Sequence, residues 1–199
     1  MSDMKTIMNV ILISLMLTGI NHFVSGQDDR ASRADIREQR EYEKQKRREE
    51  REKELERMTV ITKNMIGIQR FVLEADYLSD KYGTRVPVSP SINFIMIDSL
   101  DGTVQFGSAY SIGYNGVGGE TLDGRITKYE YNMMGRRKDS YSVWMVFMSS
   151  IGTYDITMTV NPGSYADATI RGNWSGQLNY HGKLVPLGLS KVYKGHARF

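Results

Sequence analysis

The sequence predicts a mainly β protein, an antiparallel meander of about eight strands that closes into a β-barrel and is preceded by a charged N-terminal α-helix. From residue 70 onward, short runs rich in β-branched and aromatic residues are separated by turn sequences such as "NPG". In "YDITMTV" apolar and polar residues alternate, which is typical of a strand with one buried face. Residues 28–57 contain neither Gly nor Pro and are rich in helix formers. Since strands with one apolar face bury it by closing on themselves, we expect a barrel.

The first 26 residues have the features of a secretory signal peptide. Lys5 precedes an apolar run at 7–20, which is shorter than the roughly 20 residues that a membrane-spanning helix needs. "LTG" at 17–19 resembles the start of a lipoprotein signal, but Ile20 stands where lipid attachment requires a Cys, and the chain contains no Cys. We therefore expect cleavage after Gly26 and a periplasmic or secreted protein without a lipid anchor. An uncleaved anchor helix is the alternative.

Residues 27–68 form the predicted helical arm. Its charged part, 28–57, contains eleven Lys or Arg and eleven Asp or Glu, so its net charge is zero. In pairs such as Glu43–Arg47 the acid precedes the base by four residues, which favours a helix. Because the arm has too few apolar residues for a coiled-coil seam, we interpret it as a solvated spacer. The alternative is a docking helix for an envelope protein. Apolar residues at helical spacing predict that its end packs on the body: Val60, Ile61, Met65, Ile68 and Val72.

Residues 69–187 form the predicted barrel domain, and residues 188–199 a basic C-terminal tail. The strand "RFVLEADYL" is followed by three predicted hairpins: "SINFIMID" with "TVQFGSAYS", "RITKYEYNM" with "SYSVWMVFM", and "TYDITMTV" with "SYADATIR". "SGQLNYHGKL" is the last strand. Because "YSVWMVFM" is apolar on both faces, we expect another element to cover it. Termini are usually loosely held, so we expect the tail to be solvated.

Three stretches resemble a family of exported proteins from Bacteroidetes-type bacteria that is catalogued only as a domain of unknown function. They are "GSAYSIGYNGVGGETLDGRITKYEY", "SVWMVFMSSIGTYDITMTVNPGSYADATI" and "LNYHGKL", and the similarity covers roughly residues 35–187. The resemblance implies a lipocalin-like barrel and an envelope or secreted location, and it implies no activity. Members often carry a lipoprotein Cys after the signal peptide, so Ile20 departs from the family pattern and speaks against an outer-membrane tether.

The glycine-rich stretch "GYNGVGGETLDG", residues 113–124, is the best candidate for a binding site. A phosphate-binding loop needs a helix after it, whereas this stretch ends in another turn sequence and lacks a Walker Lys. We interpret its glycines as conformational, and expect nearby tyrosines to line the mouth of the barrel. Trp144 and two core methionines are candidate pocket walls. The candidate ligand-binding residues are Tyr110, Tyr114, Gly116, Gly118, Gly119, Trp144, Met145 and Met158.

Catalytic and metal-binding patterns are scarce. After removal of the signal peptide only His181 and His196 remain, and no catalytic Gly-x-Ser-x-Gly or His-Glu-x-x-His motif occurs. We interpret His181 as a structural residue, and we expect no enzymatic activity, no metal and no cofactor. The net charge of +3 is too small to argue for a nucleic-acid partner.

Three functional hypotheses follow. The first is an exported protein that binds a small apolar ligand in the barrel or at its mouth. The second is an envelope protein–protein interaction module that uses the charged helix or the barrel surface. The third is a small outer-membrane barrel, suggested only by the C-terminal Phe199.

Overall fold

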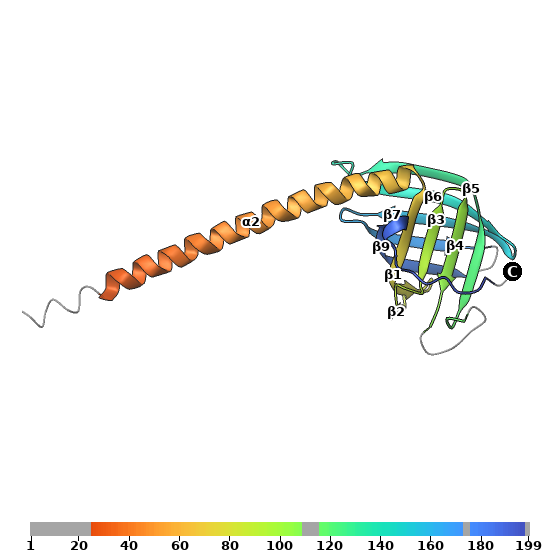
Figure 1. The fold of residues 1–199 in the computed structure, drawn as a ribbon, viewed down its shortest axis with the longest axis horizontal. Coiled ribbons are helices and arrows are strands. Elements are labelled where there is room, and N and C mark those ends of the chain that lie inside the picture. The colour runs from red at the N-terminus through yellow and green to blue at the C-terminus, as the bar shows by residue number, and fades with distance from the viewer. Residues whose placement is uncertain (1–24, 109–115, 173–175, 198–199) are drawn as a thin grey trace, which may run out of the picture. The chain divides into compact units, whose positions relative to one another are not determined.

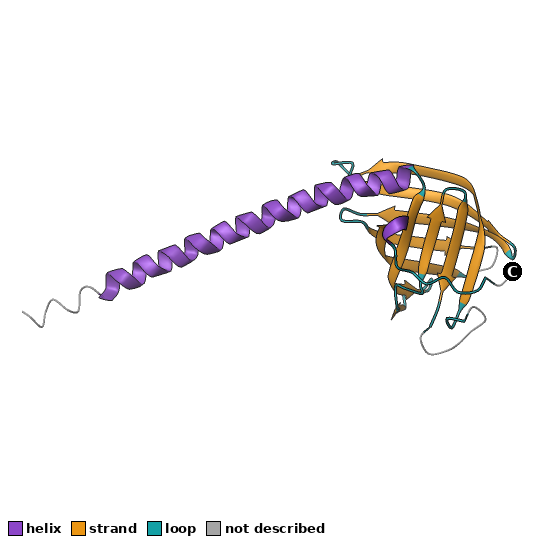
Figure 2. Cartoon of the chain, viewed as in Figure 1, coloured by secondary structure: helices purple, strands orange, loops and turns teal. Residues whose placement is uncertain are grey.

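The computed structural model describes residues 25–108, 116–172 and 176–197, and the chain divides into two compact units, Met1–Glu52 and Lys53–Phe199 (Figure 1). Helix α2, Ser25–Gly67, is followed by a sheet whose strands range from 3 to 15 residues (Figure 2). Among the described residues, no helix has the length and apolar composition required to cross a bilayer. Most of the expected signal peptide lies outside the described residues.

The strands form a single antiparallel sheet that closes on itself. They are β1 (Arg70–Ser79), β2 (Arg85–Pro87), β3 (Phe94–Asp98), β4 (Asp101–Phe106), β5 (Glu120–Met134), β6 (Ser140–Ser149), β7 (Gly152–Val160), β8 (Tyr165–Arg171) and β9 (Gln177–Pro186). Each strand from β3 to β8 pairs with the next, β1 pairs with β3, and β1 also pairs with β9. The short β2 pairs with the end of β1. The predicted eight-stranded meander barrel with an N-terminal helix is therefore confirmed.

Large side chains fill the interior of the barrel. On β7, Tyr154, Ile156, Met158 and Val160 are buried while Asp155 and Thr157 are exposed, as the alternation predicts. Aromatic and aliphatic residues from the other strands join them in one core cluster, which includes Phe71, Leu73, Tyr141, Met145, Phe147, Tyr180 and Leu184. Interiors of small barrels are commonly filled by side chains in this way. The observed interior is a hydrophobic core.

The last turns of α2 complete this core, as expected, but only part of the predicted set is buried: Met65 and Val72 are buried and Ile61 packs against the core. Met65 and Ile66 are buried, whereas Val60 and Ile68 are 60% and 62% exposed. The buried face is fixed by polar contacts, because Thr62 Oγ1 shares a hydrogen bond of 2.6 Å with Ser164 Oγ and the Tyr129 hydroxyl donates to the Ile66 backbone oxygen at 2.9 Å. The assignment of Val60 and Ile68 to the packed face is therefore wrong.

Strand β6 is also less covered than expected. Its inward residues are fully buried, but Trp144 and Val146, which point outward, are only half-buried, and Met148 is exposed. The apolar residues on the second face of β6 therefore lie on the surface of the barrel, and the expectation of a covering element is wrong.

The C-terminal residues form a strap that crosses the outside of the barrel. After β9 a short 3-10 helix, η1 (Leu187–Leu189), leads into Ser190, whose hydroxyl donates to Glu74 Oε1 at 2.7 Å. The Tyr193 backbone N–H donates to the Ser91 oxygen at 2.7 Å, and Gly195 is buried. The expectation of a solvated tail is wrong for Ser190–Gly195, because its backbone groups are bonded to the barrel.

Candidate functional site

The glycine stretch adopts the conformations that its composition suggests. Gly116 and Gly118 have positive φ angles of 76° and 77°, a region that glycine enters without strain. At Gly119 the backbone passes so close to the backbone oxygen of Phe106 that a Cβ atom would collide with it. This position therefore requires glycine. The residues that follow do not form the expected turn, because Glu120–Gly124 begins β5 and pairs with β4. Of the candidate site residues, Tyr110 and Tyr114 lie outside the described residues.

The structure does not bring the three candidate wall residues to one pocket. Met145 and Met158 are fully buried in the barrel core, on the neighbouring strands β6 and β7. Trp144 precedes Met145 on β6, so its side chain points to the opposite, outer face. There Lys128 Nζ lies 5.9 Å from the centre of the Trp144 ring. Met145 and Met158 therefore act as core residues, and Trp144 belongs to the outer surface.

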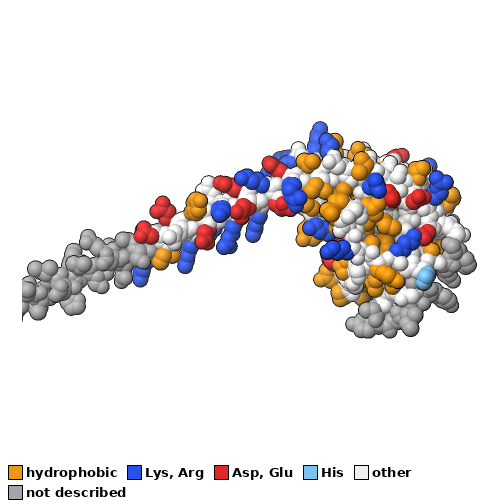
Figure 3. All heavy atoms as spheres, viewed as in Figure 1, with side chains coloured by type: hydrophobic (Ala, Val, Ile, Leu, Met, Phe, Trp, Pro, Cys, Tyr) orange, Lys and Arg blue, Asp and Glu red, His pale blue; other side chains and the backbone are white. Residues whose placement is uncertain are grey.

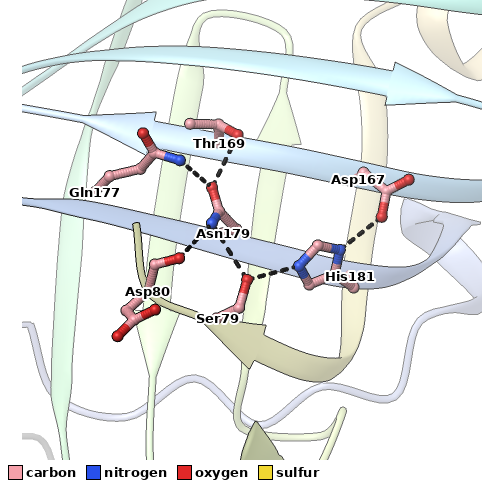
Figure 4. A network of polar contacts seen from close by, with 7 residues as sticks. All are labelled: Ser79, Asp80, Asp167, Thr169, Gln177, Asn179 and His181. Carbon is pink, nitrogen blue, oxygen red and sulfur yellow. Dashed lines mark hydrogen bonds and ion pairs between the residues drawn. The ribbon is translucent and has the colours of Figure 1, made fainter. Parts of the chain in front are cut away.

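A network of polar side chains connects β1, β8 and β9 on the outside of the barrel (Figure 4). His181 Nδ1 donates to Asp167 Oδ1 at 2.6 Å, and His181 Nε2 lies 2.9 Å from Ser79 Oγ. With Nδ1 as the donor, a neutral imidazole presents Nε2 as an acceptor, so the Ser79 hydroxyl donates to it. Asn179 Nδ2 donates to Ser79 Oγ at 3.2 Å and to the Asp80 backbone oxygen at 3.0 Å. Thr169 and Gln177 donate in turn to Asn179 Oδ1.

Ser79, His181 and Asp167 are connected in the order of a Ser–His–Asp catalytic relay. A nucleophilic serine must be reachable by substrate, and in hydrolases it commonly sits on a sharp strand-to-helix turn. Ser79 is only 5% exposed, and it lies where β1 is paired with both β2 and β9. Its oxygen is also engaged by Asn179. The geometry therefore favours a structural role in which the relay ties three strands together.

A second buried polar group is centred on Gln105, a residue that the sequence analysis missed. Its Nε2 donates to the backbone oxygens of Ile92 and Tyr193 at 3.1 and 2.9 Å. Its Oε1 accepts from the Thr121 hydroxyl and the Gly195 backbone N–H, both at 2.8 Å. Gln105 is fully buried under the strap. In sequence the only indication was a polar residue in an apolar strand, "TVQF".

An open apolar groove lies where the end of α2 and the start of β1 meet the end of β9 and the residues that follow it. Its volume is about 390 Å³, which falls in the range of small-molecule sites, roughly 300–1,000 Å³. The residues that line it are Ile61, Asn64, Met65, Ile68, Arg70, Pro186, Leu187 and Gly188. Figure 3 shows hydrophobic side chains exposed on the barrel beside the end of α2. Among the lining residues Arg70 alone is charged, and its Nε lies 2.9 Å from Asp98 Oδ1.

A depression on the outer face of β3–β5 has a different chemistry. Its volume is about 320 Å³, and its walls include Asp98, Asp101, Asp123 and Lys194. Lys194 Nζ lies 2.8 Å from Asp123 Oδ1, which also accepts from the Thr103 hydroxyl at 2.7 Å. In the described part of the chain, no three His, Cys, Asp or Glu side chains are grouped closely enough to hold a metal ion. Of the two hollows, the groove beside α2 is the one suited to an apolar molecule.

Comparison with known proteins places the barrel in a family. The family model described as "Domain of unknown function (DUF4251)" matches residues 52–184. This chain belongs to the DUF4251 family. A crystal structure of a DUF4251 family protein from Bacteroides eggerthii DSM 20697 is similar, with 29% sequence identity and a TM-score of 0.53. The similarity covers 64% of this chain and 86% of that chain. No curated protein is similar enough to match. The resemblance to a Bacteroidetes family of unknown function is thus confirmed, and the DUF4251 match begins at Glu52, one residue before the barrel unit.

Proposed function

We propose that this DUF4251 protein is an exported, non-enzymatic protein that binds a small apolar molecule in the groove beside the end of α2. The observation that carries the proposal is the set of apolar walls around an open hollow, formed by Ile61, Met65, Ile68, Pro186 and Leu187. Met65 forms the buried floor, and the other four side chains stay in partial contact with water unless a ligand covers them. Because side chains fill the core of the barrel, we place the ligand in this groove and not in the barrel interior.

A neutral fluorescent probe, N-phenyl-1-naphthylamine, tests the groove by titration into residues 27–199. Ile68→Glu places a charge on the wall of the groove, and because Ile68 is 62% exposed the substitution should not unfold the barrel. We expect it to weaken probe binding by about ten-fold or more, since burying a carboxylate beside an apolar ligand is costly. Ile151→Glu is the matched control, because Ile151 is an exposed isoleucine outside the groove. Equal effects of the two substitutions would refute the groove as the binding site.

Export rests on the apolar run at 7–20 and the polar residues after Gly26. We expect the full-length gene product, expressed in a Bacteroidetes host, to be recovered outside the cytoplasm with Gln27 as its first residue. N-terminal sequencing of the recovered protein measures this. A cytoplasmic protein that keeps Met1 would contradict the export part of the proposal.

A second candidate function, an envelope interaction module, is favoured by the exposure of the arm. Every described side chain between residues 35 and 52 is exposed. If the arm binds an envelope protein, deletion of residues 28–52 should abolish co-purification of that partner while the barrel stays folded.

The third hypothesis, an outer-membrane barrel, has less support. The outward positions of β7 and β8 include Asp155, Thr157 and Asp167, whereas the lipid-facing band of such a barrel is apolar.

A further inference from the structure

The arm part of α2 carries a continuous stripe of positive charge along one face. Six positions, spaced alternately four and three residues apart, are all Lys or Arg: Arg33, Arg37, Arg40, Lys44, Arg47 and Arg51. In an α-helix this spacing keeps side chains on the same face. All six side chains are exposed. Figure 3 shows several Lys and Arg side chains projecting along the lower edge of the helix.

The acidic residues of the arm neutralise this face only in part. No Asp or Glu occupies the stripe positions between 33 and 51, and the acids lie to either side. Two stripe residues have ion pairs among the described side chains, Lys44 with Glu41 at 2.8 Å and Arg47 with Glu43 at 3.8 Å. Exposed pairs of this kind are weak and exchange readily. The remaining cations of the stripe are free to contact an anionic partner.

The geometry of the stripe indicates which shape of anionic partner it can bind. A helix is about 10–12 Å across, so acids opposite the stripe lie about one Debye length further from a surface that touches the stripe. Flanking acids such as Glu41 and Glu43 lie beside the stripe cations and point along such a surface. A flat anionic surface therefore interacts more strongly with the cations than with the acids. A nucleic-acid duplex, whose groove would enclose the helix, also meets the flanking glutamates and is repelled by them.

The composition of the stripe indicates how deeply it would contact a bilayer. From residue 33 to residue 51 it extends about 27 Å, at a rise of about 1.5 Å per residue. Its six positions contain no aromatic or aliphatic residue, and a single flanking side chain such as Ile36 offers little apolar area to insert among acyl chains. Contact with a bilayer would remain at the level of the phosphate headgroups and would depend on salt.

We propose that the Arg33–Arg51 stripe is a docking surface for the headgroups of an anionic phospholipid bilayer. The proposal goes beyond ligand binding by the groove and stands or falls independently of it. Residues 33–51 of α2 would contact the bilayer through electrostatics alone, while the barrel unit Lys53–Phe199 supplies the ligand site.

Co-sedimentation of residues 27–199 with vesicles tests the proposal. This form keeps the whole arm and the whole barrel and removes the apolar run at 7–20, which would itself enter bilayers. We expect binding to vesicles of equal parts phosphatidylglycerol and phosphatidylcholine, none to pure phosphatidylcholine, and release when salt is raised from about 0.05 M to about 0.5 M.

Two matched double variants separate the stripe from net charge. Arg40→Gln with Lys44→Gln removes two stripe cations, and Lys46→Gln with Lys53→Gln removes two exposed cations from the opposite side of the helix. Gln is a good helix former, so both variants should keep α2. Because one cation near such a surface changes affinity by about five-fold, we expect the stripe variant to bind about ten-fold or more weakly and the control to stay within about three-fold.

Three results would overturn the proposal. They are no binding to the anionic vesicles at low salt, equal losses in the two double variants, and a stripe-dependent affinity for duplex DNA that exceeds the affinity for vesicles. The last result would assign the stripe to nucleic acid.

Discussion

Gln105 holds the C-terminal strap on the barrel through four side-chain hydrogen bonds. Its side chain joins Ile92 and Thr121 of the barrel region to Tyr193 and Gly195 of the strap. Gln105→Ala leaves these buried groups without partners, so we expect a loss of about 3 kcal/mol in the free energy of unfolding. Urea unfolding measures it, and Gln45→Ala, on the exposed arm, should change stability by less than about 0.5 kcal/mol. A loss at position 105 no larger than at position 45 would contradict this role.

A substitution of Ser79 tests whether the Ser79–His181–Asp167 network has a structural role. Ser79→Ala removes the acceptor for Asn179 Nδ2 and the donor for His181 Nε2. We expect a destabilisation of about 1 kcal/mol, because Asn179 keeps its bond to Asp80. The buried hydroxyl should also resist a fluorophosphonate probe, and mass spectrometry detects any adduct. Stoichiometric labelling of Ser79 would refute the non-enzymatic interpretation.

Tyr180 makes the stability of the barrel sensitive to alkaline pH. Burial raises the pKa of Tyr180, whose hydroxyl donates to the Gln105 backbone oxygen at 3.0 Å. In the unfolded chain the pKa of tyrosine is about 10. The stabilisation is therefore complete below pH about 10, and it falls by about 1.4 kcal/mol per pH unit above that value, because only the unfolded chain loses the proton. Urea unfolding between pH about 8 and 11 should show a shallower decline for Tyr180→Phe, and identical slopes would contradict the argument.

At the scale of elements, the periodicity of the sequence predicted the strands, but it did not predict several contacts between distant segments. Alternation in "YDITMTV" identified the buried face of β7 because each residue of a strand points opposite to its neighbours. The same rule, applied strictly, would have separated Trp144 from Met145 in the candidate pocket. The role of Gln105 was not predictable, because its partners Tyr193 and Gly195 lie about ninety residues away in the chain. The groove depends in the same way on the meeting of residues 61–70 with residues 186–188.

The strap and the Gln105 side chain should behave as one energetic unit. Truncation after Ser190 removes the Tyr193 oxygen and the Gly195 N–H from Gln105. We expect Gln105→Ala to cost clearly less in the truncated chain than in the complete one, with a coupling energy of about 1–3 kcal/mol. A double-mutant cycle from urea unfolding measures it. Additive losses would show that the strap and Gln105 act separately.

At the scale of the whole molecule, the barrel unit Lys53–Phe199 contains the complete core, including the last turns of α2. Deletion of residues 27–52 from the exported form should therefore leave its free energy of unfolding unchanged to within about 0.5 kcal/mol. Urea unfolding followed by tryptophan fluorescence measures this, since both Trp residues lie in the barrel unit. A large loss would show that the arm is part of the folding unit.

The assignment of the ligand site is the central claim, and a crystal structure of residues 27–199 bound to N-phenyl-1-naphthylamine tests it most directly. We predict density for the probe against Ile61, Ile68 and Leu187 in the groove, with the core side chains of the barrel in place. Density inside the barrel, with Met145 or Tyr180 displaced, would contradict this assignment and return the ligand to the interior.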